Sequence, residues 1–208
     1  MVGKIDKIVV SYQELKDWII EHERDEVLDL TQFDVSGLNH MFSLFYSCRA
    51  REINVSNWDV SNIESMTQMF EDCRYLQSID VSNWDVSNVK HMYAMFRGCS
   101  ALTSLDVSNW NTSKVENMRA MFNDCRSLRE LDVSNWDVSH VDNMREMFEG
   151  CSSLTSIDVS NWNVSRTRYM SELFSGCVRL ENVDVSRWRM FPSVSDWRMF
   201  YGCDSLQR

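Results

Sequence analysis

Length, composition and charge limit the classes of protein to which this chain can belong. It has 208 residues, of which 44% are hydrophobic, and its 31 acidic and 21 basic side chains give a formal net charge of -10. The hydrophobic content is sufficient for a folded core, and a single proline with six glycines argues against a disordered chain. The acidic balance disfavours a general nucleic-acid surface, because phosphate binding needs clustered Lys and Arg.

Residues 1–27 predict a strand followed by a helix, placed as a cap in front of the remaining chain. The helix is expected to begin after Ser11, whose hydroxyl can form a capping box with the Glu14 carboxylate. Leu15, Trp18 and Ile19 fall on one side of this helix, as in an element that packs on a core. The first unit of a repeat protein would otherwise expose an apolar edge, so this segment is interpreted as its cover.

Residues 28–208 are built from a repeat of 26 residues, in which tryptophan and cysteine recur at a constant step. The tryptophans are Trp58, Trp84, Trp110, Trp136, Trp162 and Trp188, and the cysteines are Cys73, Cys99, Cys125, Cys151, Cys177 and Cys203. A fixed period of this length is typical of a solenoid, in which each unit buries its apolar face only against a neighbour. We expect one elongated domain of seven units, the last one truncated and atypical, with its function on the surface.

Two hydrophobic patterns follow one another within each unit. Leu105 and Val107 alternate with Asp106 and predict a short strand whose aliphatic side chains point inward. The apolar positions from Val115 to Phe122 have helical spacing and predict a short helix. Stacked units would form an α/β solenoid with a parallel β-sheet on one face and short helices on the other.

Residues that favour helix ends flank each expected helix. Ser113 precedes it, with Glu116 three residues later at the spacing of a capping box. A glycine or an aspartate, such as Gly98 or Asp124, precedes each repeated cysteine, where a left-handed residue would end the helix. These signals favour the helical interpretation.

A long motif recurs through the units and is complete in residues 131–154. Leu-Asp-Val-Ser-Asn-Trp-Asp-Val-Ser, then Val-x-x-Met-x-x-Met-Phe-x-x-Cys-x-Ser-Leu, resembles the leucine-rich repeats of BspA-like bacterial surface proteins, a type also found in mycoplasma lipoproteins. The resemblance covers about residues 28–206. It implies a right-handed leucine-rich-repeat solenoid that binds proteins or host matrix, without a cofactor or a reaction.

Three columns of repeated side chains are interpreted as packing. The methionines are Met66, Met69, Met92, Met95, Met118, Met121, Met144, Met147 and Met170. They share the stripe of the repeated Phe, which favours core packing over an adaptable binding groove. The tryptophans favour core or corner packing, with carbohydrate stacking as the alternative. The cysteines lack the spacing of zinc or redox sites and predict buried free thiols, although disulfides between neighbouring units stay open.

An acidic column is expected on the outer side of the strands. Its members are Asp80, Asp106, Asp132, Asp158 and Asp184. In one interpretation each carboxylate accepts hydrogen bonds from adjacent Ser or backbone groups. In the other, the column meets a repetitive or cationic partner, including Ca²⁺, which favours oxygen ligands.

No combination of side chains in the sequence indicates an active site. His22, His40, His91 and His140 are assigned to no common column, and no Ser/His/Asp or Cys/His set recurs. We therefore expect a protein that is not an enzyme, with no cofactor and no metal site.

The C-terminal unit departs from the repeat and is the best candidate for a partner-binding surface. The residues are Arg187, Arg189, Phe191, Trp197, Arg198 and Tyr201. Aromatic side chains and arginines are enriched at protein interfaces. The expected partner is a protein, with self-association through this end as a further possibility, and neither nucleic acid nor membrane insertion is expected.

The leading hypothesis is a non-enzymatic protein interaction module, adhesin-like or otherwise a recognition module, of bacterial or phage origin. A structural subunit of a larger assembly, such as a phage virion or fibre, is the first alternative, and Ca²⁺ or carbohydrate binding along the columns is the second. The sequence contains no evident signal peptide or transmembrane segment. That favours a cytoplasmic or virion location. A location at the cell surface is expected only if a leader is missing from this sequence.

Overall fold

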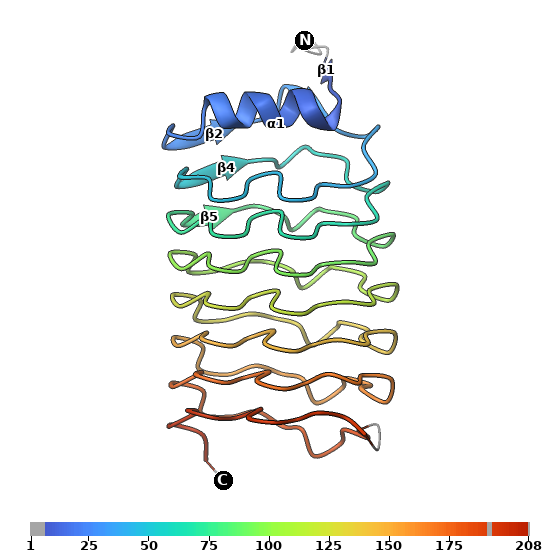
Figure 1. Ribbon diagram of the computed structural model, residues 1–208, viewed down its shortest axis with the longest axis vertical. Coiled ribbons are helices and arrows are strands. Elements are labelled where there is room, and N and C mark those ends of the chain that lie inside the picture. The colour runs from blue at the N-terminus through green and yellow to red at the C-terminus, as the bar shows by residue number, and fades with distance from the viewer. Residues whose placement is uncertain (1–6, 191–192, 208) are drawn as a thin grey trace.

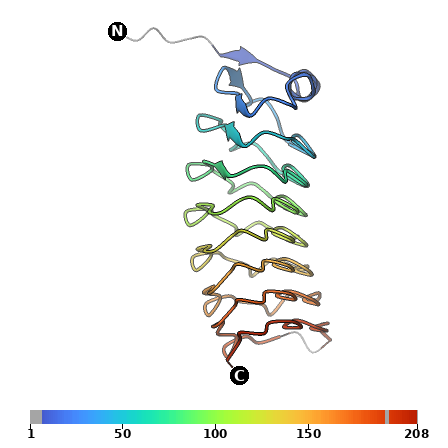
Figure 2. The same cartoon turned by 90° about the vertical axis from the view of Figure 1, so that its left-hand side faces the viewer.

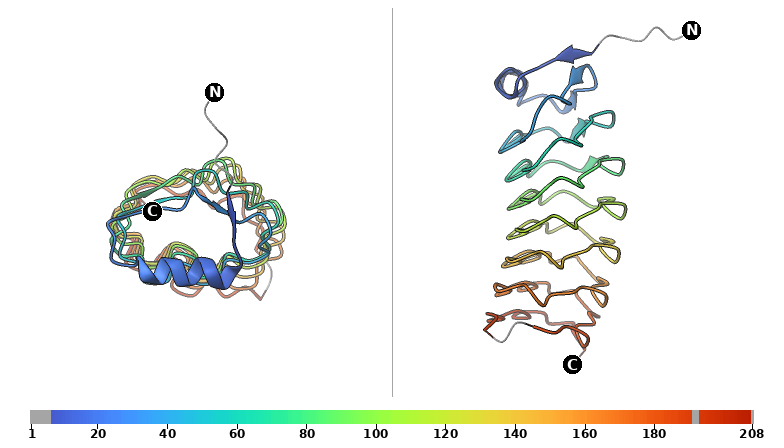
Figure 3. Two further views of the ribbon diagram at one scale, coloured as in Figure 1. Left: turned by 90° about the horizontal axis from the view of Figure 1, so that it is seen from above. Right: turned by 90° about the vertical axis from the view of Figure 1, so that its right-hand side faces the viewer.

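The computed structural model describes residues 7–190 and 193–207 and shows a stack of coils (Figure 1). One helix lies across the N-terminal end of the stack, and the last described coil forms the opposite end (Figures 1 and 2). Seen along the stack, the coils superpose as a flattened ring (Figure 3). Equivalent residues of successive units therefore lie next to one another, as the repeat predicted.

The N-terminal cap contains strand β1 (Ile8–Val9) and helix α1 (Tyr12–Glu21). Ser11 is the N-cap residue of α1, and both hydrogen bonds of the capping box with Glu14 are present. Strand β1 pairs in parallel with β3 (Phe33–Asp34). The predicted strand, helix and capping box of this segment are confirmed.

A parallel sheet joins only the first coils. It contains β2 (Val27–Asp29), β4 (Glu52–Asn54) and β5 (Ser78–Ile79), in that order. In the following coils the corresponding residues make sparser contacts, such as the hydrogen bond from Arg129 N to Thr103 O at 3.4 Å. The predicted inward aliphatic side chains are buried throughout, as Leu105 and Val107 show. The predicted parallel pairing is confirmed. The prediction that a regular sheet runs along the whole solenoid was wrong for the described residues.

No unit contains the expected helix within the described residues, and α1 is the only helix that they form. Residues 66–73 and their equivalents, here called the turn ladder, consist of successive turns. Every second N–H donates to the next coil, as Met66 N does to His91 O at 2.9 Å and Phe70 N to Met95 O at 2.8 Å. The alternate N–H groups close turns within the coil, as Met69 N does to Met66 O at 3.2 Å.

Left-handed residues at two positions in each coil explain why the turn ladder is not a helix. Gln68 and Asp72 have φ values of 57° and 59°, and the same conformation recurs in the other coils. L-residues cannot continue a right-handed helix through such values. The glycine positions were correctly predicted to be left-handed, with φ of 73° at Gly98, but they close turns and do not end helices. Ser113, expected as an N-cap, instead donates its N–H to Asn111 Oδ1 at 3.2 Å.

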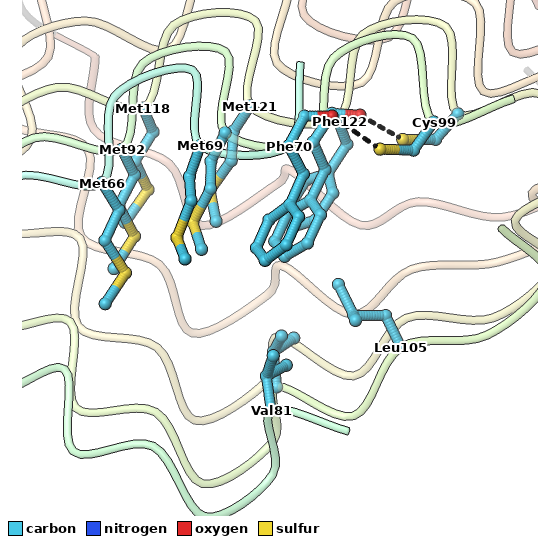
Figure 4. Close-up of a cluster of buried hydrophobic side chains, with 14 of the residues drawn as sticks. Met66, Met69, Phe70, Val81, Met92, Cys99, Leu105, Met118, Met121 and Phe122 are labelled. Atoms are coloured by element: carbon cyan, nitrogen blue, oxygen red, sulfur yellow. Dashed lines mark hydrogen bonds between the residues drawn. The ribbon is translucent and has the colours of Figure 1, made fainter. Parts of the chain in front are cut away.

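Phenylalanine and methionine from the turn ladder form the centre of the core (Figure 4). Phe rings of neighbouring coils stack nearly parallel, with centroids 5.8 Å apart for Phe96 and Phe122 and 5.7 Å apart for Phe122 and Phe148. The nine methionines of the predicted column are fully buried beside them, as Met118 and Met121 illustrate. Core packing of methionine is confirmed.

The six tryptophans of the repeated column lie at the corner that follows the strand positions and are buried. Most indole N–H groups donate to a carbonyl of the preceding coil, as Trp110 Nε1 does to Val81 O at 3.0 Å. Trp84 is the exception among the described residues, because its buried Nε1 has no hydrogen-bond partner. The predicted packing role of the column is confirmed.

This exception predicts a difference between two otherwise similar substitutions. Trp110→Phe should lower the free energy of unfolding by about 1 kcal/mol more than Trp84→Phe, because only the first removes an indole hydrogen bond, whereas the second removes a buried donor that has no partner. The two rings are 2% and 4% exposed, so the loss of packed area is comparable. Urea denaturation followed by circular dichroism measures both values, and equal losses would contradict the prediction.

The seven cysteines are free thiols, and all except the half-buried Cys203 are buried. Each thiol of the repeated column donates to a phenylalanine carbonyl of the preceding coil. The pair Cys99 and Phe70 is an example, with Sγ and O 3.2 Å apart. Burial raises the pKa of the Cys48 thiol to about 11 and that of the Cys99 thiol well above its ordinary value. The prediction of buried free thiols is confirmed, and the disulfide alternative is not realised.

Candidate functional site

The acidic column on the strand side is held by local hydrogen bonds. Asp132 Oδ1 accepts from Ser134 N at 3.0 Å and from Ser134 Oγ at 2.7 Å, and the same pair of bonds recurs at Asp80, Asp106 and Asp158. These bonds lower the pKa of Asp132, with the hydroxyl contributing most. At Asp184 the structure shows only the bond from Ser186 N, at 2.9 Å. The predicted bonding to adjacent Ser is confirmed.

A second column of the same kind was missed in the sequence. Asp85 Oδ1 accepts from Ser87 N at 3.0 Å, and Asp137 Oδ1 from Ser139 N at 2.9 Å. The hydrogen bonds to Ser87 lower the pKa of Asp85. Its sequence signal is Asp or Asn two residues before Ser, just after the tryptophan. Each such side chain closes a turn at the corner.

Two histidines do share a column, contrary to the sequence interpretation. His40 and His91 both pair in isolated parallel bridges with Ser65, which lies in the coil between them. His40 precedes Ser65 by 25 residues, whereas Ser65 precedes His91 by 26. A constant step of 26 residues therefore does not align His40 with His91. Within residues 7–190 and 193–207, no group of three or more His, Cys, Asp or Glu is arranged to hold a metal ion.

The predicted C-terminal patch divides into two groups. Arg198 lies between two exposed rings on the last turn ladder, with its guanidinium carbon 4.3 Å from the Trp197 centroid and 4.7 Å from that of Tyr201. Trp197 is 56% exposed and Tyr201 is 62% exposed. Arg187 and Arg189 lie elsewhere on the coil, on either side of the buried Trp188. Phe191 lies outside the described residues.

Unpaired backbone donors accompany the first of these groups. Within the described part of the chain, four N–H groups of the last turn ladder make no hydrogen bond to another backbone group. They belong to Asp196, Arg198, Phe200 and Gly202. The equivalent donors of the preceding coil are Met170, Glu172, Phe174 and Gly176, which bond to carbonyls of residues 195, 197, 199 and 201. The C-terminal end therefore presents hydrogen-bond donors beside an aromatic and arginine cluster.

The N-terminal end is closed in a complementary way. The Tyr12 hydroxyl donates to the Phe42 carbonyl, and Lys16 Nζ donates to the Ser43 carbonyl at 2.7 Å. Helix α1 thus covers this edge with side-chain donors. None of the helices in the described residues has the length and apolar character needed to cross a membrane.

The fold and its columns define a repeat protein of leucine-rich-repeat character, in which stacked coils bury Leu, Ile and Val at fixed positions. The chain belongs to the family described as "Mycoplasma protein of unknown function, DUF285", whose model matches residues 13–128 and 100–208. No curated protein matches the chain.

The solved structures that show remote likeness include a TLR13 complex and an internalin. The TLR13–ssRNA13 complex is 17% identical with a TM-score of 0.42, over 95% of this chain and 29% of that chain. An internalin (inlF) from Listeria monocytogenes str. 4b F2365 is 10% identical with a TM-score of 0.33, over 86% of this chain and 59% of that chain. The chain thus spans less than two thirds of the length of either.

Proposed function

We propose that this protein is a non-enzymatic protein interaction module that binds its partner at the C-terminal end of the solenoid. The observation that carries the proposal is the exposed cluster of Trp197, Arg198 and Tyr201 on the last turn ladder. Exposed aromatic rings held by an arginine supply large contact area with little loss of side-chain entropy on binding. Right-handed winding and a BspA-like, adhesin-like role are part of the proposal, on the strength of the repeat motif.

A structural subunit formed by stacking copies has less support. Head-to-tail stacking that continued the turn ladder would need the first-coil carbonyl of Phe42 in a second copy, the equivalent of Thr67 O, which accepts from Ser43 N. Tyr12 already donates to the Phe42 carbonyl, and helix α1 covers the edge. Binding of Ca²⁺ along the acidic column is also less supported, because one oxygen of the carboxylate, as Asp132 Oδ1 shows, already accepts two bonds from Ser134. Carbohydrate stacking on the tryptophans of the repeated column has no support, because the rings of that column are buried.

Selection from a random peptide library tests the proposed docking end. Peptides enriched on the immobilised protein are measured in solution against the double variant Trp197→Ala plus Arg198→Ala. We expect affinity to fall at least tenfold, because truncating two central interface side chains removes more than about 1.4 kcal/mol.

Tyr75→Ala is the matched control, because Tyr75 is as exposed as Trp197, at 56%, but lies far along the chain. This variant should bind the same peptides within twofold of the wild type. Enriched peptides that bind the double variant as tightly as the wild type would show that partner recognition occurs on another surface.

A further inference from the structure

Arginines replace neutral or acidic residues at one corner of the last coils. The 26-residue step aligns Arg187 with Asn161 and Arg189 with Asn163. It likewise aligns Arg166 with Asn62, Asn88, Lys114 and His140, so this column changes from asparagine to basic residue types along the stack. The columns that end in Arg166, Arg187 and Arg189 thus all become positively charged at this corner, whereas the Asp and Ser columns on the strand side keep their residue types.

The replacement gives up local hydrogen bonding. In the preceding unit Asn163 Oδ1 accepts from Ser165 N at 3.2 Å and closes the corner turn. An arginine has no acceptor and cannot form this bond. The other units keep Asp or Asn at this corner position. A departure from such a local pattern is typical of functional positions.

The arginines line a depression in the surface. Arg187 and Arg189 stand two residues apart on either side of the inward-pointing Trp188, so both side chains point outward. They border a cavity of about 510 Å³ whose wall also contains Asn161, Asn163 and Ser165. Ser165 is shared with a second cavity of about 410 Å³ that Arg166 lines.

The charges of this corner are available to a ligand. No carboxylate of the described residues lies within 4.0 Å of a nitrogen of Arg166, Arg187 or Arg189. Arg168, on the rim of the second cavity, is instead bound to Asp142. Two outward guanidinium groups with amide and hydroxyl donors between them suit the paired oxygens of a carboxylate.

We propose that Arg187 and Arg189, with Arg166 beside them, bind the carboxylates of a short acidic segment of a partner protein. This deepens the proposed interaction function by naming the partner's chemistry at a second contact point. A long polyanion such as nucleic acid fits less well, because the chain carries a net charge of -10 and its acidic columns continue from this corner. The basic site is long enough for only a few carboxylates.

Fluorescence anisotropy with a labelled peptide of six glutamates tests the site. Reverting Arg187→Asn and Arg189→Asn together restores the residues of the preceding unit, which fold at this corner. We expect the affinity for the peptide to fall at least tenfold, and the wild-type affinity to weaken as salt screens the charges. Arg129→Gln plus Arg179→Gln removes the same charge from exposed positions elsewhere and should change affinity less than twofold.

Three outcomes would overturn the proposal. These are the absence of peptide binding by the wild type, equal losses in the two double variants, and tighter binding of a single-stranded oligonucleotide of equal charge. The last would indicate a general polyanion surface. The Trp197→Ala plus Arg198→Ala variant should bind the glutamate peptide normally, so failure of this site and failure of the C-terminal docking end give different results.

Discussion

Phe122→Ala is expected to lower the free energy of unfolding by about 3–5 kcal/mol, a loss in the upper range for a single core substitution. The ring is fully buried and stacks between Phe96 and Phe148, with an additional contact to Trp136 at 6.3 Å between centroids. Its removal opens a cavity in the middle of the stack, where neighbouring coils on both sides lose contact. Urea denaturation followed by tryptophan fluorescence measures the change.

Phe42→Ala provides the comparison, because that ring is 48% exposed on the first turn ladder. Substitutions at such positions change stability by about 0.5 kcal/mol or less. In a solenoid each unit contacts only its neighbours, so Phe122→Ala should also broaden the transition by weakening coupling between the two halves. A loss below about 1 kcal/mol for Phe122→Ala would contradict the continuous stacked core.

Raising the pH above 9 is expected to destabilise the protein steeply. Burial holds the thiol of Cys48 neutral and raises its pKa from 9.0 to about 11, and burial also raises the pKa values of Cys99, Cys125, Cys151 and Cys177. The unfolded chain loses these protons first. The contribution of each thiol is therefore complete below pH 9 and declines as the pH rises toward the folded pKa, by about 1.4 kcal/mol per pH unit.

Urea denaturation under reducing conditions between pH 8.5 and about 9.5 measures this slope, below the ordinary pKa of tyrosine at about 10. Cys125→Ala removes one fully buried thiol and should reduce the slope by about 1.4 kcal/mol per pH unit. Cys203→Ala is the control, because Cys203 is only half-buried and its slope contribution should be smaller. A slope that does not change in Cys125→Ala would mean that the buried thiols do not control alkaline unfolding.

The inward and outward positions of the repeat could be predicted from the sequence because they depend only on register. Trp110, Met118 and Phe122 are buried where their period placed them, and Asp106 is exposed. Ser11 and Glu14 likewise predicted the start of α1, since a capping box is a local interaction. The column that pairs His40 with His91 could not be predicted from a constant step, because the first coil is one residue shorter.

The helical interpretation of the turn ladder failed because apolar spacing alone does not determine where backbone N–H groups bond. Turns closed by left-handed residues such as Gln68 and Ala94 place apolar side chains inward at nearly the same intervals as a helix. A neighbouring coil then accepts every second N–H, which an isolated helix would bond internally. Nothing within one unit distinguishes the two arrangements.

By itself the sequence determined that this chain is a stack of equivalent coils, which side chains face the interior, and that a helix opens the stack. Those properties follow from a constant period and from contacts a few residues apart. Only the tertiary structure decided the turn ladder, the separation of Arg187 and Arg189 from Trp197, and the unpaired donors at the C-terminal end. Each of these depends on which backbone and side-chain groups of one coil meet the next, and that partnership exists only after the coils have stacked.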